Sequence, residues 1–310
     1  MDPIKIGGMK GIVIFAVVLC LLPVGGNAAT ITVNCDAGEK IQAKLDSAKP
    51  GDTLLVTGTC NENVRIEVEV QRITLDGQGR ATINGADVSA GRDTLYVNGR
   101  GIIIKGFTIT GGGQDGLHIS GATAFIDGNT IQRTRSRGIF LDRGTFATIF
   151  NNRIQDNPTH GIMVHENSIA RIGFALPIDP KPSPNTIQKN GGNGIYVWRS
   201  STAWIVSNTI TGNKRNGIWI NRNSEAQITG NRISGNGEDA ISVSRNSGVI
   251  FGTGEAPLRR EANNTDAQLN NGGFGVRCTI GGYVEGPQGT LNGAKGAKEC
   301  DKGCIDSLTP

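Results

Sequence analysis

The side chains best suited to catalysis gather in the middle of the chain, where charged and ring-bearing residues recur at intervals of 22–33 residues. Removing a proton beside a sugar carboxylate needs a cation that neutralises the carboxylate, a base, and an acid on the far side. His165 is the candidate base, and Asp142 would orient it. The candidate acids are Tyr196 and His160. The candidate cations are Arg143, Arg199 and Arg222. This set of residues indicates β-elimination or C5-epimerisation of a uronate.

Glycoside hydrolysis is a second chemistry that the same stretch could support, because it uses a pair of carboxylates. Asp142 and Glu166 are one repeat apart and would form such a pair. Neighbouring arginines favour the ionised form of both carboxylates, so a general acid is hard to identify, and we rank hydrolysis lower. The predicted catalytic residues are Asp142, His165, Glu166 and Arg199.

A row of mostly ring-bearing residues recurs with the same spacing, and each member lies between two apolar residues of a predicted strand. We call it the central row, and its members are Tyr96, His118, Phe140, Met163, Tyr196, Trp219 and Ser242. Alternation places these side chains on the face opposite their buried neighbours, so we expect the row to face solvent and to stack on sugar rings. The predicted ligand-binding residues are Tyr96, His118, Phe140, Arg143, Tyr196, Trp198, Trp219 and Arg222.

The elements that position these side chains are copies of one short repeat. A small residue such as Gly116, Gly138 or Gly161 opens each copy and precedes an apolar-x-apolar unit. A second alternating unit and an Asn-x-Ile unit follow, and turn residues separate the three. This alternation predicts short strands with one buried face. Such strands bury little alone, but in stacked coils each strand pairs in parallel with its copy about 4.8 Å away.

The repeat resembles the right-handed parallel β-helix of the pectate lyase-like superfamily. The resemblance covers roughly residues 31–284 and includes KPGDTLLVTGTC, NVRIEVEVQRITLDGQGRATI and the repeated NGI-x-[VI] unit. The segment HGIMVHENS also resembles the alginate epimerase branch of this fold, although the Asp-Pro-His-Glu motif of that branch is absent. The resemblance implies an all-β fold, namely a single-stranded right-handed parallel β-helix of about 8–9 coils of 22–23 residues.

The two ends of the chain depart from the repeat. Residues 1–28 begin with positive charge and continue into a short apolar run and small residues, which is typical of a secretory signal peptide. The remaining chain divides into an N-terminal cap at 29–60, the β-helix at 61–285 and an irregular tail at 286–310.

The predicted N-terminal cap contains a short helix and a disulfide. The segment Glu39–Lys49 is apolar at helical spacing and is followed by Pro-Gly, so we expect a short amphipathic helix over the open end of the coils. Cys35 and Cys60 flank this segment and are predicted to form a disulfide. At the other end, Cys278 is expected to pair with Cys300 or Cys304.

Charge and cysteine content limit the partners of the protein. The formal net charge is only +4, so nucleic acid is not an expected partner. The leader and the cysteines indicate a secreted or periplasmic protein with no membrane span after cleavage. We predict a monomer that acts on or binds an acidic, uronate-containing polysaccharide or cell-surface glycan without a cofactor. Calcium stays open as a ligand, although no ligand cluster is evident. The alternative to an enzyme is a non-catalytic polysaccharide-binding or structural β-helix protein.

Overall fold

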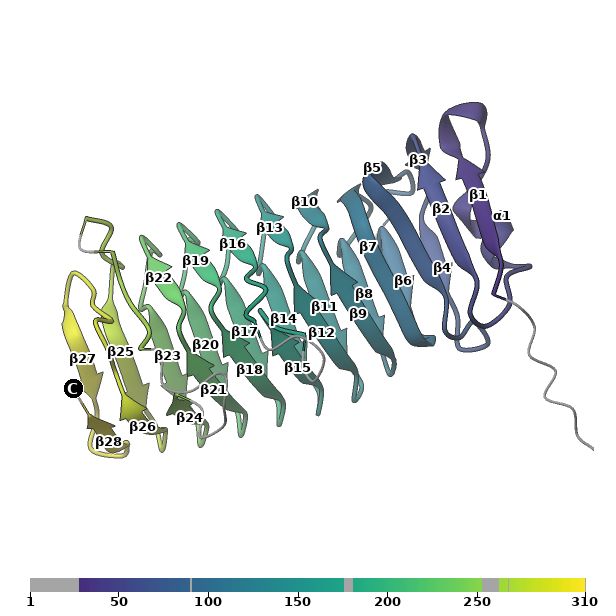
Figure 1. Ribbon diagram of the computed structural model, residues 1–310. Coiled ribbons are helices and arrows are strands. Elements are labelled where there is room, and N and C mark those ends of the chain that lie inside the picture. The colour runs from purple at the N-terminus through teal and green to yellow at the C-terminus, as the bar shows by residue number, and fades with distance from the viewer. Residues whose placement is uncertain (1–27, 90, 176–180, 253–261, 267, 310) are drawn as a thin grey trace, which may run out of the picture.

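The computed structural model describes residues 28–89, 91–175, 181–252, 262–266 and 268–309. Over these residues the chain winds into a column of about 11 stacked turns, with its N-terminal coils at one end and its C-terminal coils at the other (Figure 1). Except for its last residue, the predicted signal peptide at 1–28 lies outside the described residues. No helix among the described residues is long and apolar enough to cross a membrane.

Two sheets run the length of the column. The smaller sheet has ten strands, each from a different coil. Its strands are β4 (Val64–Ile66), β6 (Leu95–Val97), β8 (Leu117–Ser120), β11 (Ile139–Asp142), β14 (Ile162–His165), β17 (Ile195–Trp198), β20 (Ile218–Asn221), β23 (Ile241–Ser244), β25 (Phe274–Thr279) and β27 (Gly296–Cys300).

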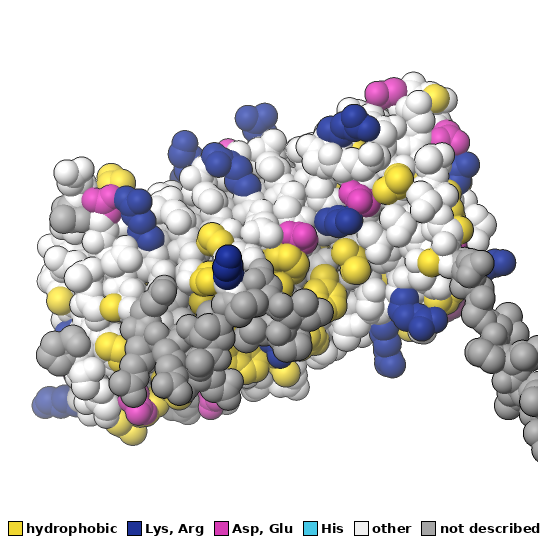
Figure 2. Space-filling model, viewed as in Figure 1, with side chains coloured by type: hydrophobic (Ala, Val, Ile, Leu, Met, Phe, Trp, Pro, Cys, Tyr) yellow, Lys and Arg dark blue, Asp and Glu magenta, His cyan; other side chains and the backbone are white. Residues whose placement is uncertain are grey.

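The larger sheet has 18 strands, because most coils contribute two strands to it. They are β1 (Thr30–Asn34), β2 (Thr53–Thr57), β3 (Thr59–Asn61), β5 (Thr74–Gly85), β7 (Arg100–Gly111), β9 (Thr123–Asp127), β10 (Thr130–Thr134), β12 (Phe146–Phe150), β13 (Arg153–Gln155), β15 (Ile169–Ile172), β16 (Thr186–Gln188), β18 (Thr202–Val206), β19 (Thr209–Thr211), β21 (Glu225–Thr229), β22 (Arg232–Ser234), β24 (Gly248–Phe251), β26 (Tyr283–Pro287) and β28 (Ile305–Thr309). The part of this sheet seen in Figure 2 carries scattered Lys and Arg and a band of hydrophobic side chains.

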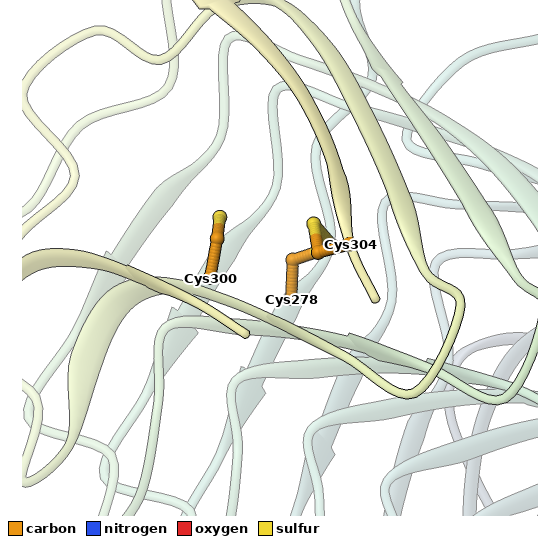
Figure 3. Close-up of side chains that lie close together, drawn as sticks. All are labelled: Cys278, Cys300 and Cys304. Atoms are coloured by element: carbon orange, nitrogen blue, oxygen red, sulfur yellow. A yellow bond between two sulfur atoms is a disulfide. The ribbon is translucent and has the colours of Figure 1, made fainter. Parts of the chain in front are cut away.

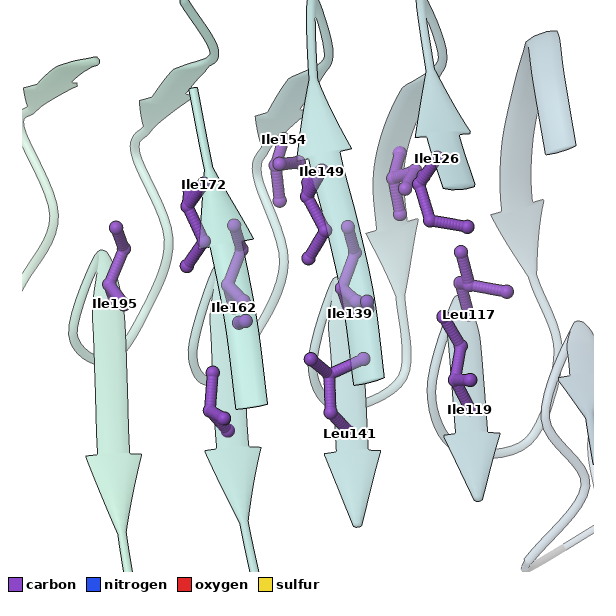
Figure 4. Close-up of a cluster of buried hydrophobic side chains, with 14 of the residues drawn as sticks. Leu117, Ile119, Ile126, Ile139, Leu141, Ile149, Ile154, Ile162, Ile172 and Ile195 are labelled. Carbon is purple, nitrogen blue, oxygen red and sulfur yellow. The ribbon is translucent and has the colours of Figure 1, made fainter. Parts of the chain in front are cut away.

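Every pairing between strands is parallel, and equivalent residues of successive repeats face each other. Ile139 of β11, for example, pairs with Leu117 of β8 and with Ile162 of β14. The apolar residues of each repeat point into the column and are almost completely buried, so that Ile stacks on Ile from coil to coil (Figure 4). The predicted parallel stacking of one coil on the next is therefore confirmed.

Buried asparagines form a ladder along the inside of a turn, as the Asn-x-Ile units predicted. The Asn208 amide donates to the carbonyls of Ile172 and Val206 at 3.0 Å and to Asn231 Oδ1 at 3.1 Å. Its oxygen accepts from both the backbone and the side-chain nitrogen of Asn185, at 3.0 and 2.9 Å. A second buried ladder, which the sequence analysis missed, comprises Asn157, Asn190, Asn213, Asn236 and Asn271.

The N-terminal end is covered by a shorter helix than expected. Helix α1 spans Ile41–Leu45, not the whole of 39–49, and it follows a 3-10 turn, η1 (Cys35–Ala37). Gln42 donates to the Arg65 carbonyl at 3.1 Å and accepts from the Arg65 amide at 2.7 Å. The helix therefore satisfies the open edge of β4 much as another strand would, which limits strand addition at this end.

Two expectations about the ends of the column need correction. The segment 286–310 is not an irregular tail, because it contains β27 and β28, which pair in parallel with β25 and β26. The strands β1 and β2 also pair with each other ahead of the predicted β-helix. The column therefore has about 11 turns instead of 8–9. The C-terminal coil was missed because its outward and inward residues do not follow the Ile-rich pattern of the other coils.

The two predicted cysteine pairings are present as disulfides. Cys35 is bonded to Cys60, and Cys278 is bonded to Cys304, which decides between the two partners left open for Cys278. Cys300 keeps a free thiol and lies beside the second disulfide (Figure 3). Both disulfides join successive coils at the ends of the column.

The Asn ladder should contribute more to stability than an exposed ladder of the same kind. In the Asn208→Ala variant, buried backbone groups lose their partners, and we expect the free energy of unfolding to fall by about 3 kcal/mol. The matched control is Gln188→Ala, which removes one member of a half-buried outward Gln ladder and should cost less than about 1 kcal/mol. Urea denaturation followed by circular dichroism measures both. Equal losses in the two variants would contradict this account.

Candidate functional site

The central row follows the outer face of the ten-stranded sheet, with one residue on each strand from β6 to β23. Successive members are paired in register, in the order Tyr96, His118, Phe140, Met163, Tyr196, Trp219, Ser242. The rings of Tyr196 and Trp219 stack with centroids 4.7 Å apart and planes only 8° from parallel. A spacing close to the distance between strands means that these rings stack along the axis of the column.

The central row is less exposed than the sequence analysis expected. Its side chains point outward, but Phe140, Met163 and Tyr196 are only 8%, 5% and 7% exposed and form an apolar cluster of their own. Trp198 and Trp219 pack against this cluster and stay half-buried. The rings therefore cover one another. The expectation of a fully solvent-facing row is wrong for these three residues and for Ser242, which is 8% exposed. The accessible rings lie toward the two ends of the row.

His118 is held between two carboxylates. Its Nδ1 lies 2.9 Å from Asp93 Oδ2, and its Nε2 lies 3.2 Å from Asp142 Oδ1, although the second contact is not aligned as a hydrogen bond. Burial of the ring lowers its pKa, but the two carboxylates outweigh burial and raise the pKa to about 9. His118 is therefore a cation at neutral pH.

The expected pairing of Asp142 with His165 does not form, because Asp142 faces His118. Burial raises the pKa of Asp142, but His118 and Ser120 outweigh this effect, and the net pKa is lowered. Neither ring nitrogen of His165 has a hydrogen-bond partner, and the ring stacks on Trp198 with centroids 4.8 Å apart. Burial lowers the pKa of His165, with Arg199 and Glu166 acting in opposite directions, so the ring is neutral at neutral pH. Asp142 is an ion-pair partner of His118 rather than an orienting group for His165.

His160 is also a neutral histidine on this face. Its Nδ1 accepts a hydrogen bond from the Asn193 backbone amide at 3.0 Å, which places the ring proton on Nε2. Burial, with the nearby Arg137 and Arg215, lowers the pKa of His160 to about 4. Its ring lies 5.1 Å from the Tyr196 ring, so the two candidate acids of the sequence analysis are neighbours.

A buried ion pair that the repeat pattern did not predict lies at the centre of the face. Asp115 is fully buried and accepts from the Arg137 side chain at 2.8 and 2.7 Å. The Arg137 guanidinium also lies over the Phe140 ring, 3.6 Å from its centroid. Because Arg137 is bound by Asp115 in this way, it is a structural cation that fixes Phe140. Both residues precede an opening small residue of the repeat, and that shared position is a signal that could have revealed the pair.

A second row of charged residues lies where the chain leaves the ten-stranded sheet. We call it the turn row, and it comprises Arg143, Glu166, Arg199, Arg222 and Arg245. Every member has a positive φ, between 49° and 55°, in the left-handed region that disfavours long side chains by about 1 kcal/mol or more.

The ion pairs of the turn row are confined to its first three members. Arg199 lies 3.4 Å from Glu166, and Arg143 lies 3.9 Å from Asp142. Arg199 and Arg222 also approach the Trp198 ring, at 4.5 and 5.2 Å from its centroid. No described carboxylate lies within ion-pair distance of Arg222 or Arg245. Glu166 is engaged with Arg199 in one of these ion pairs.

The face is hollowed where the central row ends. Two adjoining hollows of about 350 and 420 Å³ share Trp219, Ser242 and Arg277. The first also takes in Arg215 and Lys295, and the second takes in Arg245. Ser242 is on β23, four strands along the sheet from β11 and Asp142, so the hollows are separate from the histidine cluster.

Three groups of side chains could be considered for a metal ion, because their ligand atoms lie within 4.8 Å of one another. Two of these groups contain the disulfides Cys35–Cys60 and Cys278–Cys304, whose sulfurs are already bonded. The third joins Asp93 and His118 to Asp115, which is bound by Arg137. All three groups are therefore engaged in other bonds.

The fold and this face define a parallel β-helix protein with a row of arginines on the outer face of its ten-stranded sheet. The sequence matches the family described as the right handed beta helix region over residues 57–173 and 180–253, and the chain belongs to this family. No curated protein matches the chain.

Solved structures share the fold at low sequence identity. The alginate lyase from Paenibacillus sp. str. FPU-7 is 18% identical with a TM-score of 0.56, covering 91% of this chain and 99% of that one. Pectate lyase Pel9A is 12% identical with a TM-score of 0.56, covering 91% and 82%. The A-module of the mannuronan C-5 epimerase of Azotobacter vinelandii is 12% identical with a TM-score of 0.55, covering 91% and 89%. At these identities the similarity shows the fold alone.

The pKa values of His118 and His160 should lie far apart. We expect His118 to titrate near pH 9 and His160 near pH 4, which nuclear magnetic resonance of the ring nitrogens measures. Because the folded pKa of His118 lies above its ordinary 6.5, its ion pairs stabilise the protein below about pH 6.5, and this stability is lost as pH rises through 9. The Asp93→Asn variant should lower the pKa of His118 and leave that of His160 in place. A wild-type His118 pKa near 6.5 would contradict the described geometry.

Proposed function

We propose that the outer face of the ten-stranded sheet binds an acidic polysaccharide that contains uronate units. The turn row is the observation that carries this proposal. It stacks four arginines and one glutamate on successive coils, and Arg222 and Arg245 have no described carboxylate beside them. Adjacent members are about 4.8 Å apart, which is well within the screening length of about 8 Å at physiological salt. The positive charges of neighbouring arginines therefore repel one another. A polyanion with repeated charges would reduce this repulsion.

The ligand is a sugar polymer because rings accompany the charges. Trp198 lies beside the arginines, and Trp219 is half-buried at the end of the central row. Aromatic faces bind the apolar faces of flat rings, while guanidinium groups bind carboxylates through two parallel hydrogen bonds. Solved structures named as an alginate lyase and a pectate lyase share the fold, which supports this class of ligand without deciding the sugar. The disulfides support a place outside the cytoplasm, in the periplasm or secreted.

Binding should depend on the unpaired arginines. We expect the double substitution Arg222→Ala and Arg245→Ala to weaken binding of an oligouronate by about tenfold or more, about 1.4 kcal/mol, because two attractive charges are lost. Isothermal titration calorimetry with oligomannuronate and oligogalacturonate measures the affinity, with neutral cello-oligosaccharides as the ligand control.

The matched protein control is Arg153→Ala, because Arg153 is an exposed arginine of the other sheet. Its affinity should equal that of the wild type, and affinity of the wild type should fall as salt is raised. Equal affinity for neutral and acidic oligosaccharides would overturn the proposal.

A catalytic role in β-elimination or C5-epimerisation is the second candidate, and one observation favours it. His160 and His165 are neutral on a face that carries arginines, because burial lowers the pKa of each. The ring nitrogens of His165 have no hydrogen-bond partner, so this imidazole can accept the C5 proton once an arginine has neutralised the sugar carboxylate. His160 carries its proton on Nε2 and would act as a donor instead. Hydrolysis is less favoured, because the pKa of Asp142 is lowered and Glu166 is paired with Arg199.

Three readouts separate these chemistries from binding alone. The protein is incubated with alginate and pectate, and ultraviolet absorbance of unsaturated ends, proton exchange at C5 and reducing sugars are followed. If the face is catalytic, the His165→Ala variant should lose about 10²–10⁴-fold in rate, because the base is removed, while oligouronate affinity changes little. No signal in any readout, together with intact binding, would identify a non-catalytic binding or structural protein instead.

A further inference from the structure

The stack of rings in the central row ends abruptly at Ser242. Trp219, Ser242 and Arg277 are paired in register on the consecutive strands β20, β23 and β25. One face of the Trp219 indole is covered by Tyr196, and its Nε1 donates to Ser244 Oγ at 3.2 Å. The Arg215 guanidinium lies over the same indole, 5.5 Å from its centroid. On β23, on the side away from Tyr196, a serine replaces the next ring. A slot is therefore left between an aromatic face and a guanidinium.

The spacing of the strands leaves room for one sugar ring between Trp219 and Arg277. Adjacent strands are about 4.8 Å apart, so the backbones that bear Trp219 and Arg277 are separated by roughly 9.6 Å. A flat ring between two surfaces needs contact distances of about 3.5–4.0 Å on each side. The two adjoining hollows, of about 350 and 420 Å³, extend this slot in both directions along β23.

Cations and carboxylates both line the slot. Glu238 and Asp239 line the first hollow, and Asp301 lines the second. Arg277 is bound by Glu299 at 2.7 Å and Arg215 by Glu238 at 3.2 Å, so both are held in place. Lys295 lines one hollow and Arg245 lines the other, and no described carboxylate lies within ion-pair distance of either. The slot thus offers a free positive charge at each end and a ring-binding surface between them.

We propose that this slot is the anchoring subsite for the acidic polysaccharide, with one uronate ring stacked on Trp219 over Ser242. The polysaccharide then runs parallel to β23, across the column, from Lys295 toward Arg245, and not along the central row. The carboxylates of neighbouring units pair with these two cations. This inference rests on the proposed function, because it assigns the place and direction of the same ligand.

Filling the slot tests the proposal. The Ser242→Phe variant adds the missing ring and continues the stack, so the fold should be retained with an unchanged or higher melting temperature. We expect its affinity for a tetrameric oligouronate to fall by about tenfold or more, because the ligand ring is displaced. The matched control is Thr209→Phe, which adds the same ring at an outward position of β19 on the other sheet and should bind as the wild type does.

A double-mutant cycle that compares the open and the filled slot gives a second readout. Lys295→Gln and Arg245→Gln should each weaken binding about threefold or more in the wild type and should have no further effect in Ser242→Phe. Wild-type affinity in Ser242→Phe would overturn the subsite while leaving the proposed function in place, since the glycan would then bind elsewhere on the face. Failure of the wild type to bind any oligouronate would overturn both.

Discussion

In-register parallel pairing of one coil on the next is the constraint on which the rest of the structure depends. Each strand is too short to be stable alone, and its edges are satisfied only by the copies before and after it. Pairing in register brings together residues 22–33 positions apart in the chain, such as Tyr96 with His118 and Met163 with Tyr196. Equivalent side chains of successive repeats therefore form a row along the column.

The rows divide by the side of the sheet to which they point. Inward rows are limited to residues that either pack or satisfy the buried backbone, which is why isoleucine and asparagine recur there. Outward rows have no such limit, so they differ from coil to coil. The central row changes from rings to Ser242, and the turn row carries charge at a backbone conformation that would suit Gly or Asn better. Packing and backbone conformation do not require these residues on the outer face. For this reason the outer face is the functional candidate.

The sequence predicted the rows well and the contacts between rows poorly. The period of the repeat determined which residues pair across strands, as with Trp219 and Ser242. A shift of one residue in the parallel register would turn the buried apolar side chains to the outer face, so only one register is possible. The choice of Asp142 as the partner of His118 and not of His165 depends on diagonal contacts and on side-chain rotamers, which periodicity does not specify. The burial of Phe140 and Tyr196 was missed for the same reason, since outward rings cover one another. The C-terminal coil was missed because its strands lack the repeat's isoleucines.

The crystal structure of the protein soaked with an acidic oligosaccharide tests the central claim most directly. The register of the coils predicts that the sugar lies on the outer face of the ten-stranded sheet, with a ring against an aromatic side chain and a carboxylate within ion-pair distance of a turn-row arginine. A sugar bound to the 18-stranded sheet, with the arginines of the turn row still free, would contradict the account.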